Sequence, residues 1–251
     1  MLVCMFILFI YIYAKIYPLS CPPIETTRTR LEIYIEAFKN VLPPLILILL
    51  VLGSILLGIA TPTESASVGA AGASLLAFTK GELTFKNLKE VSLSTVKLSS
   101  FVFVILIGAS MFSLVFRGFN GDELIEHALG GLPGGQVGAL IIVMLAIFVL
   151  GFFLDYIEII FVIVPLVGPV LIANGADPLW LGIMISLNLQ TSFLTPPFGF
   201  SLFFLRGVAP PEIQTKNIYR GVIPYIGIQI IAIIVVGFIP EIATWLPRSI
   251  F

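Results

Sequence analysis

Long apolar stretches recur along the whole chain, separated by short segments that carry charges, glycines or prolines. Apolar residues dominate 41–79, 98–116, 137–173 and 222–246, and such stretches reach the roughly 20 residues that a helix needs to cross a bilayer. They lack the two-residue alternation of outer-membrane barrel strands. The pattern predicts an all-α, polytopic membrane protein in the lipid bilayer, with 222–246 as an uninterrupted last helix.

The first long stretch, 41–79, is interrupted near its middle by GIATPTES. Thr61 or Thr63 can cap a helix that begins near Glu64, and Pro62 suits the first turn, where its missing N–H is not needed. The alanines, glycines and serines that follow permit close helix packing. TPTE therefore predicts a break between two helical arms. The residues alone leave open whether this motif also serves transport.

The preceding segment, 25–40, is charged but carries apolar residues at helical spacing. These positions are Leu31, Ile35, Phe38 and Leu42. One apolar face on a charged helix predicts an amphipathic helix lying in the membrane interface. We expect it to end at Pro43-Pro44.

Residues 1–24 begin with an apolar run, 2–13, that is shorter than a full membrane span. The run lacks the positive amino-terminal region and the small-residue cleavage site of a signal peptide. We expect it to be the second half of a transmembrane helix followed by a loop, with Met1 as an internal start.

A second interruption, NLQTSFLTPPFG at 188–199, breaks the apolar run 179–205. In hydrocarbon an unsatisfied backbone polar group costs several kcal/mol, so irregular backbone persists only inside protein or beside a wet cavity. Adjacent prolines end a helix and free carbonyls on one side and amides on the other. Carbonyl and hydroxyl oxygens suit a hard cation, and a helix N-terminus suits an anion. The expected ion- and substrate-binding residues are Asn188, Thr191, Ser192, Thr195, Pro196, Pro197 and Gly199, with Thr191 and Thr195 as sodium ligands.

A proline kink is the alternative explanation of this break, because threonine and serine hydroxyls often bond only to their own helix. Two prolines, a glycine and four polar side chains on one helical face favour a binding site. Discontinuous helices with such polar breaks form the midplane sites of sodium-coupled carriers.

Asp155 and Glu158 lie three positions apart inside apolar sequence, a spacing that places both on one helical face. A carboxylate at the bilayer centre costs about 2.5–3.5 kcal/mol on insertion scales, so such groups usually face a cavity or a partner. Both are candidate binding residues, with a water-exposed helix end as the alternative. Gly108, in GASMFS, is a further candidate, although small residues more often mark helix packing.

Composition agrees with a membrane protein and excludes other classes. Hydrophobic residues make up 59% of the 251 residues and charged residues 11%, and the mean hydropathy is +1.12, which leaves too little polar surface for a soluble domain. A net charge of −1 offers no nucleic-acid-binding face. Cys4 and Cys21 form neither a disulfide framework nor a metal site, and no cofactor is expected. The only histidine, His127, lies in a polar loop, so no base accompanies Ser192 at membrane depth and an enzyme is not expected.

Lysine and arginine orient the chain. They are concentrated in 15–40, 80–97 and 206–221, whereas the loop 117–135 is mainly acidic. Cytoplasmic loops carry the excess of positive residues, which predicts that the three basic segments are cytoplasmic and that 117–135 lies outside.

Four segments carry a family resemblance in chain order. They are GIATPTESASVGA, GFFLDYIEIIFVIVPLVGP, NGADPLWLGIMISLNLQTSFLTPPFGFSLFFLRGVAP and the closing IYRGVIPYIGIQIIAIIVVGFIPEIATWLP. From about residue 25 to the C-terminus, the chain resembles the large membrane subunit of tripartite ATP-independent periplasmic (TRAP) transporters. The resemblance implies sodium-driven uptake of organic anions across a bacterial inner membrane, with a periplasmic substrate-binding protein and a small four-helix membrane subunit as partners. It also implies an elevator-type fold of two inverted repeats with re-entrant hairpins.

The chain is shorter than that subunit, so we expect only its C-terminal repeat, not competent alone. QTSFLTPPFGFSLFFLRGVAP resembles the branch associated with mannitol or chloroaromatic compounds, although we expect a carboxylate or 2-oxo acid as cargo. A membrane scaffold fragment without transport is the alternative.

The predicted organisation has five parts, and the resemblance adds the idea that the interface helix acts as a lever. The parts are 1–24, a remnant helix and loop; 25–40, the interface helix; 41–96, scaffold-like helices around TPTE; 97–221, a transport-like region with broken helices; and 222–251, the last transmembrane helix and C-terminus.

Overall fold

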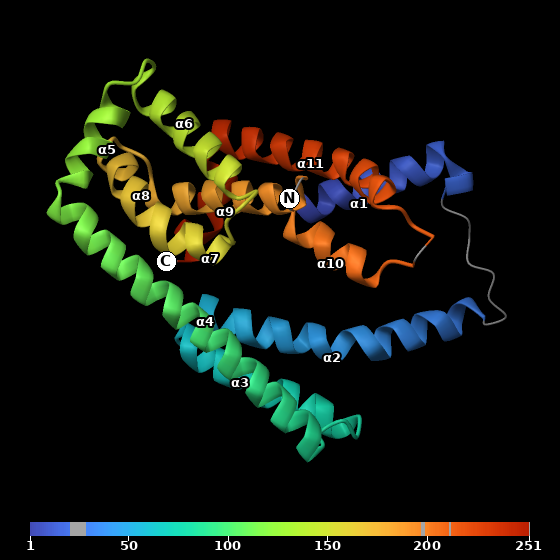
Figure 1. Ribbon diagram of the computed structural model, residues 1–251. Coiled ribbons are helices and arrows are strands. Elements are labelled where there is room, and N and C mark those ends of the chain that lie inside the picture. Colours follow the sequence, from blue (N-terminus) through green and yellow to red (C-terminus); the bar gives the residue numbers. More distant parts are fainter. Residues whose placement is uncertain (21–28, 197–198, 211, 251) are drawn as a thin grey trace. The chain divides into compact units, whose positions relative to one another are not determined.

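The computed structural model describes residues 1–20, 29–196, 199–210 and 212–250. All regular elements in these ranges are helices (Figure 1). In chain order they are α1 (Leu2–Ile16), η1 (Pro18–Ser20), α2 (Arg30–Leu56), α3 (Pro62–Thr79), α4 (Phe85–Gly118), α5 (Gly121–Gly130), α6 (Gly135–Leu150), α7 (Tyr156–Glu158), the π-helix η2 (Ile159–Ile163), α8 (Val164–Ala173), α9 (Pro178–Leu194), α10 (Phe200–Val208), α11 (Thr215–Phe238) and α12 (Glu241–Ile250).

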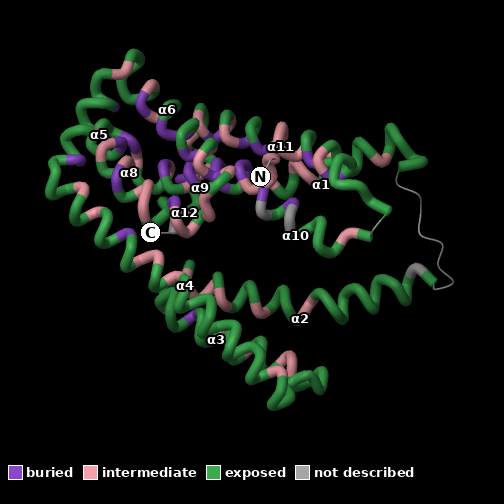
Figure 2. Tube along the Cα trace, in the orientation of Figure 1, coloured by how far each residue is buried: buried purple, intermediate pink, exposed green. Residues whose placement is uncertain are grey.

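Four helical stretches in the described chain are long and apolar enough to cross a membrane: Leu31–Leu56, Phe85–Gly118, Tyr156–Ala173 and Thr215–Phe238. The pair α5 and α6, bent by 117° at a short break, makes a fifth if it is one broken span. Large apolar side chains are exposed along most of these stretches, and Figure 2 shows mainly exposed positions along α2 and α4, as expected for helices that face lipid rather than water. The prediction of an all-α polytopic membrane protein is confirmed.

The chain divides into two compact units, and the division falls inside α4. One unit comprises Met1–Ile16 and Ser100–Arg248, and the other comprises Tyr17–Ser99 and Ser249–Phe251. Each unit has its own packing.

In the second unit, α2 packs against α3. Ser65 is fully buried, and its hydroxyl lies 2.8 Å from that of Ser54. A Cβ atom added at Gly72 would lie 2.3 Å from Leu47 Cδ1, so the absence of a side chain there lets the two helices approach closely.

A capping box begins α3. The Thr61 hydroxyl accepts a hydrogen bond from the Glu64 amide at 3.4 Å, and the Glu64 carboxylate accepts one from the Thr61 amide at 2.8 Å. Pro62 occupies the first helical position. The predicted break at TPTE, between two helical arms, is confirmed.

The helix α2 differs from its prediction. Residues 25–28 of the predicted interface helix lie outside the described residues, and α2 begins at Arg30 behind a capping box of Thr29 and Glu32. The prediction that it ends at Pro43-Pro44 is wrong, because α2 continues through both prolines to Leu56. The fixed φ of proline is helical, so two prolines remove two hydrogen bonds without forcing the chain out of the helix. Its place in the membrane interface stays a prediction.

The first unit has its core around α9, which packs against α6, α10 and α11. Figure 2 shows buried positions on α6, α8, α9 and α11. The buried apolar side chains of this core include Ala139, Val143, Ile147, Ile159, Leu171, Leu181, Ile185, Leu189 and Val236.

Polar contacts fix the beginning of α9. The chain turns at NGADP, with Gly175 at φ +101° and the Asp177 carboxylate accepting a hydrogen bond from the Trp180 amide at 2.9 Å. Asp177 also pairs with Arg248 of α12 at 2.6 Å. The Trp180 amide and then Arg248 hold the pKa of Asp177 below its usual value. The Trp180 indole N–H donates to the Val236 carbonyl of α11 at 2.8 Å.

Three predicted segments have different bounds in the structure. The last membrane helix is α11, which ends at Phe238 rather than at 246, because Pro240 pushes Ile239 out of the helical region. The predicted loop 117–135 contains α5, whose first turn holds Asp122 and Glu123, a favourable place for acidic side chains. Most of the basic segment 80–97 is the first part of α4.

Candidate functional site

The predicted break in 179–205 is present within the first unit. Helix α9 ends at Leu194, Thr195 is extended at φ −92° and ψ 126°, and α10 begins at Phe200. Thr195 precedes Pro196, and a residue before proline is disfavoured in the helical region. Pro196 lies in the turn, while Pro197, a predicted site residue, lies outside the described residues.

Gly199 allows the backbone to fold closely at this break. Its N–H donates to the Thr195 carbonyl at 3.2 Å. A Cβ atom added at Gly199 would lie 2.8 Å from the Phe193 carbonyl oxygen and 3.1 Å from that of Thr195. Two carbonyl oxygens therefore lie beside this glycine, and any larger residue would displace them.

The polar side chains of α9 are largely inside the protein. Asn188, Thr191 and Ser192 are buried, with Thr191 and Ser192 at 0% exposure. The Asn188 amide donates to the Met144 carbonyl of α6 at 2.7 Å, which ties the two helices together.

The three hydroxyls of this region donate to their own helix. Thr191 bonds to the Leu187 carbonyl at 2.8 Å, Ser192 to Leu189 at 2.8 Å, and Thr195 to Thr191 at 2.9 Å. This is the local bonding expected of a simple kink. A hydroxyl that donates keeps two lone pairs, however, so these oxygens can still accept a hydrogen bond or contact a cation.

The break after α6, at Gly151, lies next to the carboxyl end of α9. Helix α6 ends at Leu150, and a Cβ atom added at Gly151 would lie only 2.2 Å from the Ser192 hydroxyl oxygen. Beyond the turn, the Tyr156 and Phe193 rings pack edge to face with centroids 5.8 Å apart. The carboxyl ends of α6 and α9 therefore lie side by side. Each end carries partial negative charge from its last carbonyls, so the junction favours a cation.

Asp155 and Glu158 do not both lie within one helix, as the prediction of a shared helical face required. Asp155 precedes α7 as its N-cap, and its carboxylate accepts a hydrogen bond from the Tyr156 amide at 2.7 Å. The helix is not continuous here because the chain turns between Gly151 and Asp155. Both carboxylates are partly exposed, which matches the alternative of a helix end.

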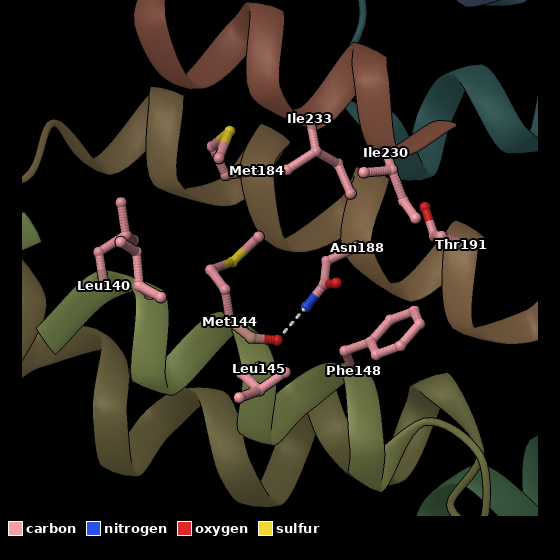
Figure 3. A pocket seen from close by; sticks show the side chains of 10 residues that line it. Leu140, Met144, Leu145, Phe148, Met184, Asn188, Thr191, Ile230 and Ile233 are labelled. Carbon is pink, nitrogen blue, oxygen red and sulfur yellow. Dashed lines mark hydrogen bonds between the residues drawn. The ribbon is translucent and has the colours of Figure 1, made fainter. Parts of the chain in front are cut away.

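A hollow of about 400 Å³ lies beside this junction, between α6, α9 and α11 (Figure 3). Asn188 and Thr191 are its polar lining, and the remainder is apolar. The apolar residues are Leu140, Ile141, Met144, Leu145, Phe148, Met184, Ile230 and Ile233. The break rather than the hollow thus offers the oxygen atoms that an ion needs.

The other predicted site residues lie elsewhere. Gly108 is within α4, where an added Cβ atom would meet no described atom within 4 Å. Thr61, Thr63 and Glu64 belong to the second unit, where Thr61 and Glu64 cap α3.

Sequence reasoning missed Gln229. This residue of α11 is 1% exposed, and among the described residues neither polar atom of its side chain has a hydrogen-bond partner. The signal was present, because a glutamine stands in the middle of the apolar run 222–246.

Comparison with known proteins decides the family. Residues 1–242 match the family described as tripartite ATP-independent periplasmic transporter, DctM component. The chain belongs to this family. Its DctM-type sequence is 30% identical to the C4-dicarboxylate TRAP transporter large permease protein of Vibrio cholerae, over 97% of the chain and 57% of the relative.

Two further DctM relatives are named for different cargoes. The ectoine TRAP transporter large permease of Halomonas elongata is 29% identical, over 98% of the chain and 56% of the relative. The sialic acid TRAP transporter large permease of Vibrio cholerae is 28% identical, over 90% of the chain and 52% of the relative. The chain spans about half the length of these curated relatives.

DctM membership confirms the family resemblance and the location in the inner membrane. The relatives are named permeases, in agreement with the prediction that the protein is not an enzyme. Together with the apolar helices, this makes the chain a multi-pass membrane protein of the DctM family.

Proposed function

We propose that the chain supplies part of the ion- and substrate-binding region of a sodium-coupled importer of organic anions. The observation that carries the proposal is the meeting of two helix carboxyl ends, at Gly151 and Ser192, beside a break lined by carbonyl and hydroxyl oxygens. Such a junction is a preformed cation site in an otherwise apolar protein.

Sodium is the coupling ion in this proposal. The described residues hold no group of three or more His, Cys, Asp or Glu that could bind a metal, and the ligands in this proposal are neutral oxygens. They come from the backbone at the break and from Thr191 and Thr195. Neutral carbonyl and hydroxyl oxygens suit a weakly bound monovalent ion that must leave again on each cycle.

The cargo is an organic anion, a carboxylate or 2-oxo acid, that lies against the first amides of α10. The name of the Vibrio cholerae C4-dicarboxylate relative supports this class. The three relatives nevertheless carry different cargo names, so this membrane segment does not by itself identify the substrate. The assignment to a mannitol or chloroaromatic branch stays a prediction.

The partners we propose are a periplasmic substrate-binding protein and a small four-helix membrane subunit, in an elevator-type mechanism. Family membership supports both partners. In this mechanism the α2 helix would act as a lever between the scaffold and the mobile part of the transporter.

Thermal unfolding of the purified chain in lipid nanodiscs tests the ion site. A ligand at 100 times its Kd stabilises the folded state by about 2.7 kcal/mol. Sodium chloride should therefore raise the melting temperature above that in potassium or choline chloride at equal ionic strength. Equal melting temperatures in all three salts would overturn the sodium site and favour a scaffold without transport.

A further inference from the structure

A short helix, α12 (Glu241–Ile250), follows the last membrane-spanning helix. Two residues separate it from α11, which ends at Phe238, and its residues up to Arg248 belong to the first unit. Its 10 residues extend about 15 Å at 1.5 Å per residue, which is about half the hydrocarbon thickness of a bilayer. This helix is therefore too short to cross the membrane.

The side chains of α12 form an inner and an outer face. Thr244 is buried, and Ala243 packs against the core of the first unit. Ile242, Trp245 and Leu246 are exposed, with Trp245 at 69%. Because residues three and four positions apart share one side of a helix, these three large apolar side chains form one outer face. The helix is amphipathic, and its apolar face points away from the protein.

Contacts with α9 determine how α12 lies on the first unit. Arg248 pairs with Asp177 at 2.6 Å, so the C-terminal part of α12 lies at the start of α9, while its N-terminal part follows the end of α11. The Trp180 indole donates to the Val236 carbonyl at 2.8 Å, which places the start of α9 and the end of α11 at the same level. Both ends of α12 therefore lie at this level, and α12 runs across these two helices rather than along them.

This level is the edge of the membrane. Because α11 is long and apolar enough to cross a bilayer, a helix that begins two residues after its end and runs across it lies at the bilayer surface. Phe238 and Ile239 are also exposed, so large apolar side chains continue without interruption from α11 into α12. Tryptophan is enriched at this depth, because its ring is apolar and its N–H is polar.

We propose that α12 lies flat in the membrane interface, with Ile242, Trp245 and Leu246 inserted among the lipids. Its partner is the boundary between headgroups and acyl chains, where a helix with one apolar face is stable. Since the segment 206–221 is predicted to be cytoplasmic, α11 ends outside and the outer leaflet holds α12.

The Arg248–Asp177 pair gives this helix a structural role. It joins α12 to the start of α9, so the helix that leads to the break is held at the membrane surface by its first residues. The interface helix does not depend on the sodium site, and a failure of the sodium test would leave it standing.

Fluorescence quenching by brominated lipids in nanodiscs tests the depth of the native Trp245. The chain has two tryptophans, so the emission that is lost in Trp245→Phe, which keeps Trp180, belongs to Trp245. We expect bromine near the lipid carbonyls to quench this emission about twice as strongly as bromine near the chain ends, because an interface helix buries its apolar face only about 5–10 Å into the boundary.

The half-buried Trp180, measured alone in Trp245→Phe, is the control and should be quenched less than Trp245. Equal or weaker quenching of Trp245 by the shallow bromine would overturn the proposal. Absence of quenching by both lipids would also overturn it, since protein or water would then cover this face.

The same method tests whether the helix lies flat. Ile242→Trp and Leu246→Trp are each made in Trp245→Phe, and both positions are exposed, so neither change disturbs the core. These positions are four residues apart, or about 6 Å along the helix axis. A flat helix places both tryptophans at the same depth, whereas a depth difference of more than about 3 Å, half of that axial distance, would overturn the proposed orientation.

Discussion

Thr195 is the residue on which the proposed ion site depends most directly. Its backbone leaves the helix because Pro196 follows, and its carbonyl turns back to accept the Gly199 amide at 3.2 Å. Its hydroxyl donates to the Thr191 carbonyl at 2.9 Å, which leaves the lone pairs of the hydroxyl oxygen available. One residue thus brings a carbonyl and a hydroxyl oxygen to the break.

Thr195→Val should raise the sodium concentration for half-maximal uptake about tenfold, equivalent to about 1.4 kcal/mol. The cause is the loss of one oxygen ligand, which should cost at least as much as a hydrogen bond of about 0.5–1.5 kcal/mol. The measurement is uptake by a transport-competent assembly that contains the chain.

Thr244→Val is the matched control for this change. Thr244 is 2% exposed, and its hydroxyl donates to the Pro240 carbonyl four residues back at 3.1 Å, so it loses the same kind of helix bond. An equal change in sodium dependence in both variants would assign the effect to helix bonding rather than to an ion ligand.

Single residues were predictable where their partner is close in sequence. The cap of Thr61 on Glu64 follows from a spacing of three. The neighbours of Asn188 and Ser192, by contrast, are Met144 and Gly151, which only tertiary packing brings to α9. Sequence could therefore mark α9 as polar but could not say what its side chains face.

Two pairs of adjacent prolines behave differently at the scale of elements. Pro43 and Pro44 lie inside the continuous helix α2, whereas α9 ends before Pro196. A glycine soon after the second pair, Gly199 at φ −4° and ψ 95°, lets the chain leave helical geometry. In α2 the next glycine is Gly53. A pair of prolines alone therefore does not predict a helix break, whereas a pair of prolines followed closely by a glycine does.

Replacing Pro196 and Pro197 together by alanine should straighten the segment. Two restored N–H groups can bond to the carbonyls of Ser192 and Phe193, which would remove the proposed ligands and abolish uptake while membrane insertion persists. Alanine at Pro43 and Pro44, where the helix is already continuous, should leave the sodium dependence of uptake unchanged. Uptake that survives the first pair of changes would make the break a mere kink.

Glycine at 72 sets the approach of α2 and α3. Gly72→Ala should destabilise the chain by about 1–3 kcal/mol, the usual cost of overpacking, because the new methyl group would lie 2.3 Å from Leu47 Cδ1. Gly53→Ala, where nothing lies within 4 Å, should be neutral or stabilising by up to about 1 kcal/mol. Chemical denaturation of both variants measures the difference, and equal effects would contradict close packing at Gly72.

For the whole molecule, the long helix α4 gives the orientation a structural basis. Its 34 residues extend about 50 Å at 1.5 Å per residue, more than the roughly 30 Å of the hydrocarbon core. Lys86 lies near its start and Glu123 just beyond its end, in α5. One helix can therefore place these residues on opposite sides of the membrane.

Labelling by a membrane-impermeant thiol reagent should reach the cysteine of Glu123→Cys from the periplasm but not that of Lys86→Cys. Both variants carry Cys4→Ser and Cys21→Ser, so that each has one thiol. The excess of lysine around position 86 predicts the cytoplasmic side. The reverse labelling would overturn the predicted orientation.

The contact between Gly151 and Ser192 also constrains how this protein can change over generations. A methyl group at 151 would overlap the serine hydroxyl, so a lineage that acquires alanine there keeps its packing only if 192 becomes smaller, as glycine would be. Either substitution alone should be disfavoured, since alanine at 151 overpacks the junction and glycine at 192 leaves a gap. The two positions should therefore be inherited as a pair, because the residue at each one limits which residues the other can accept.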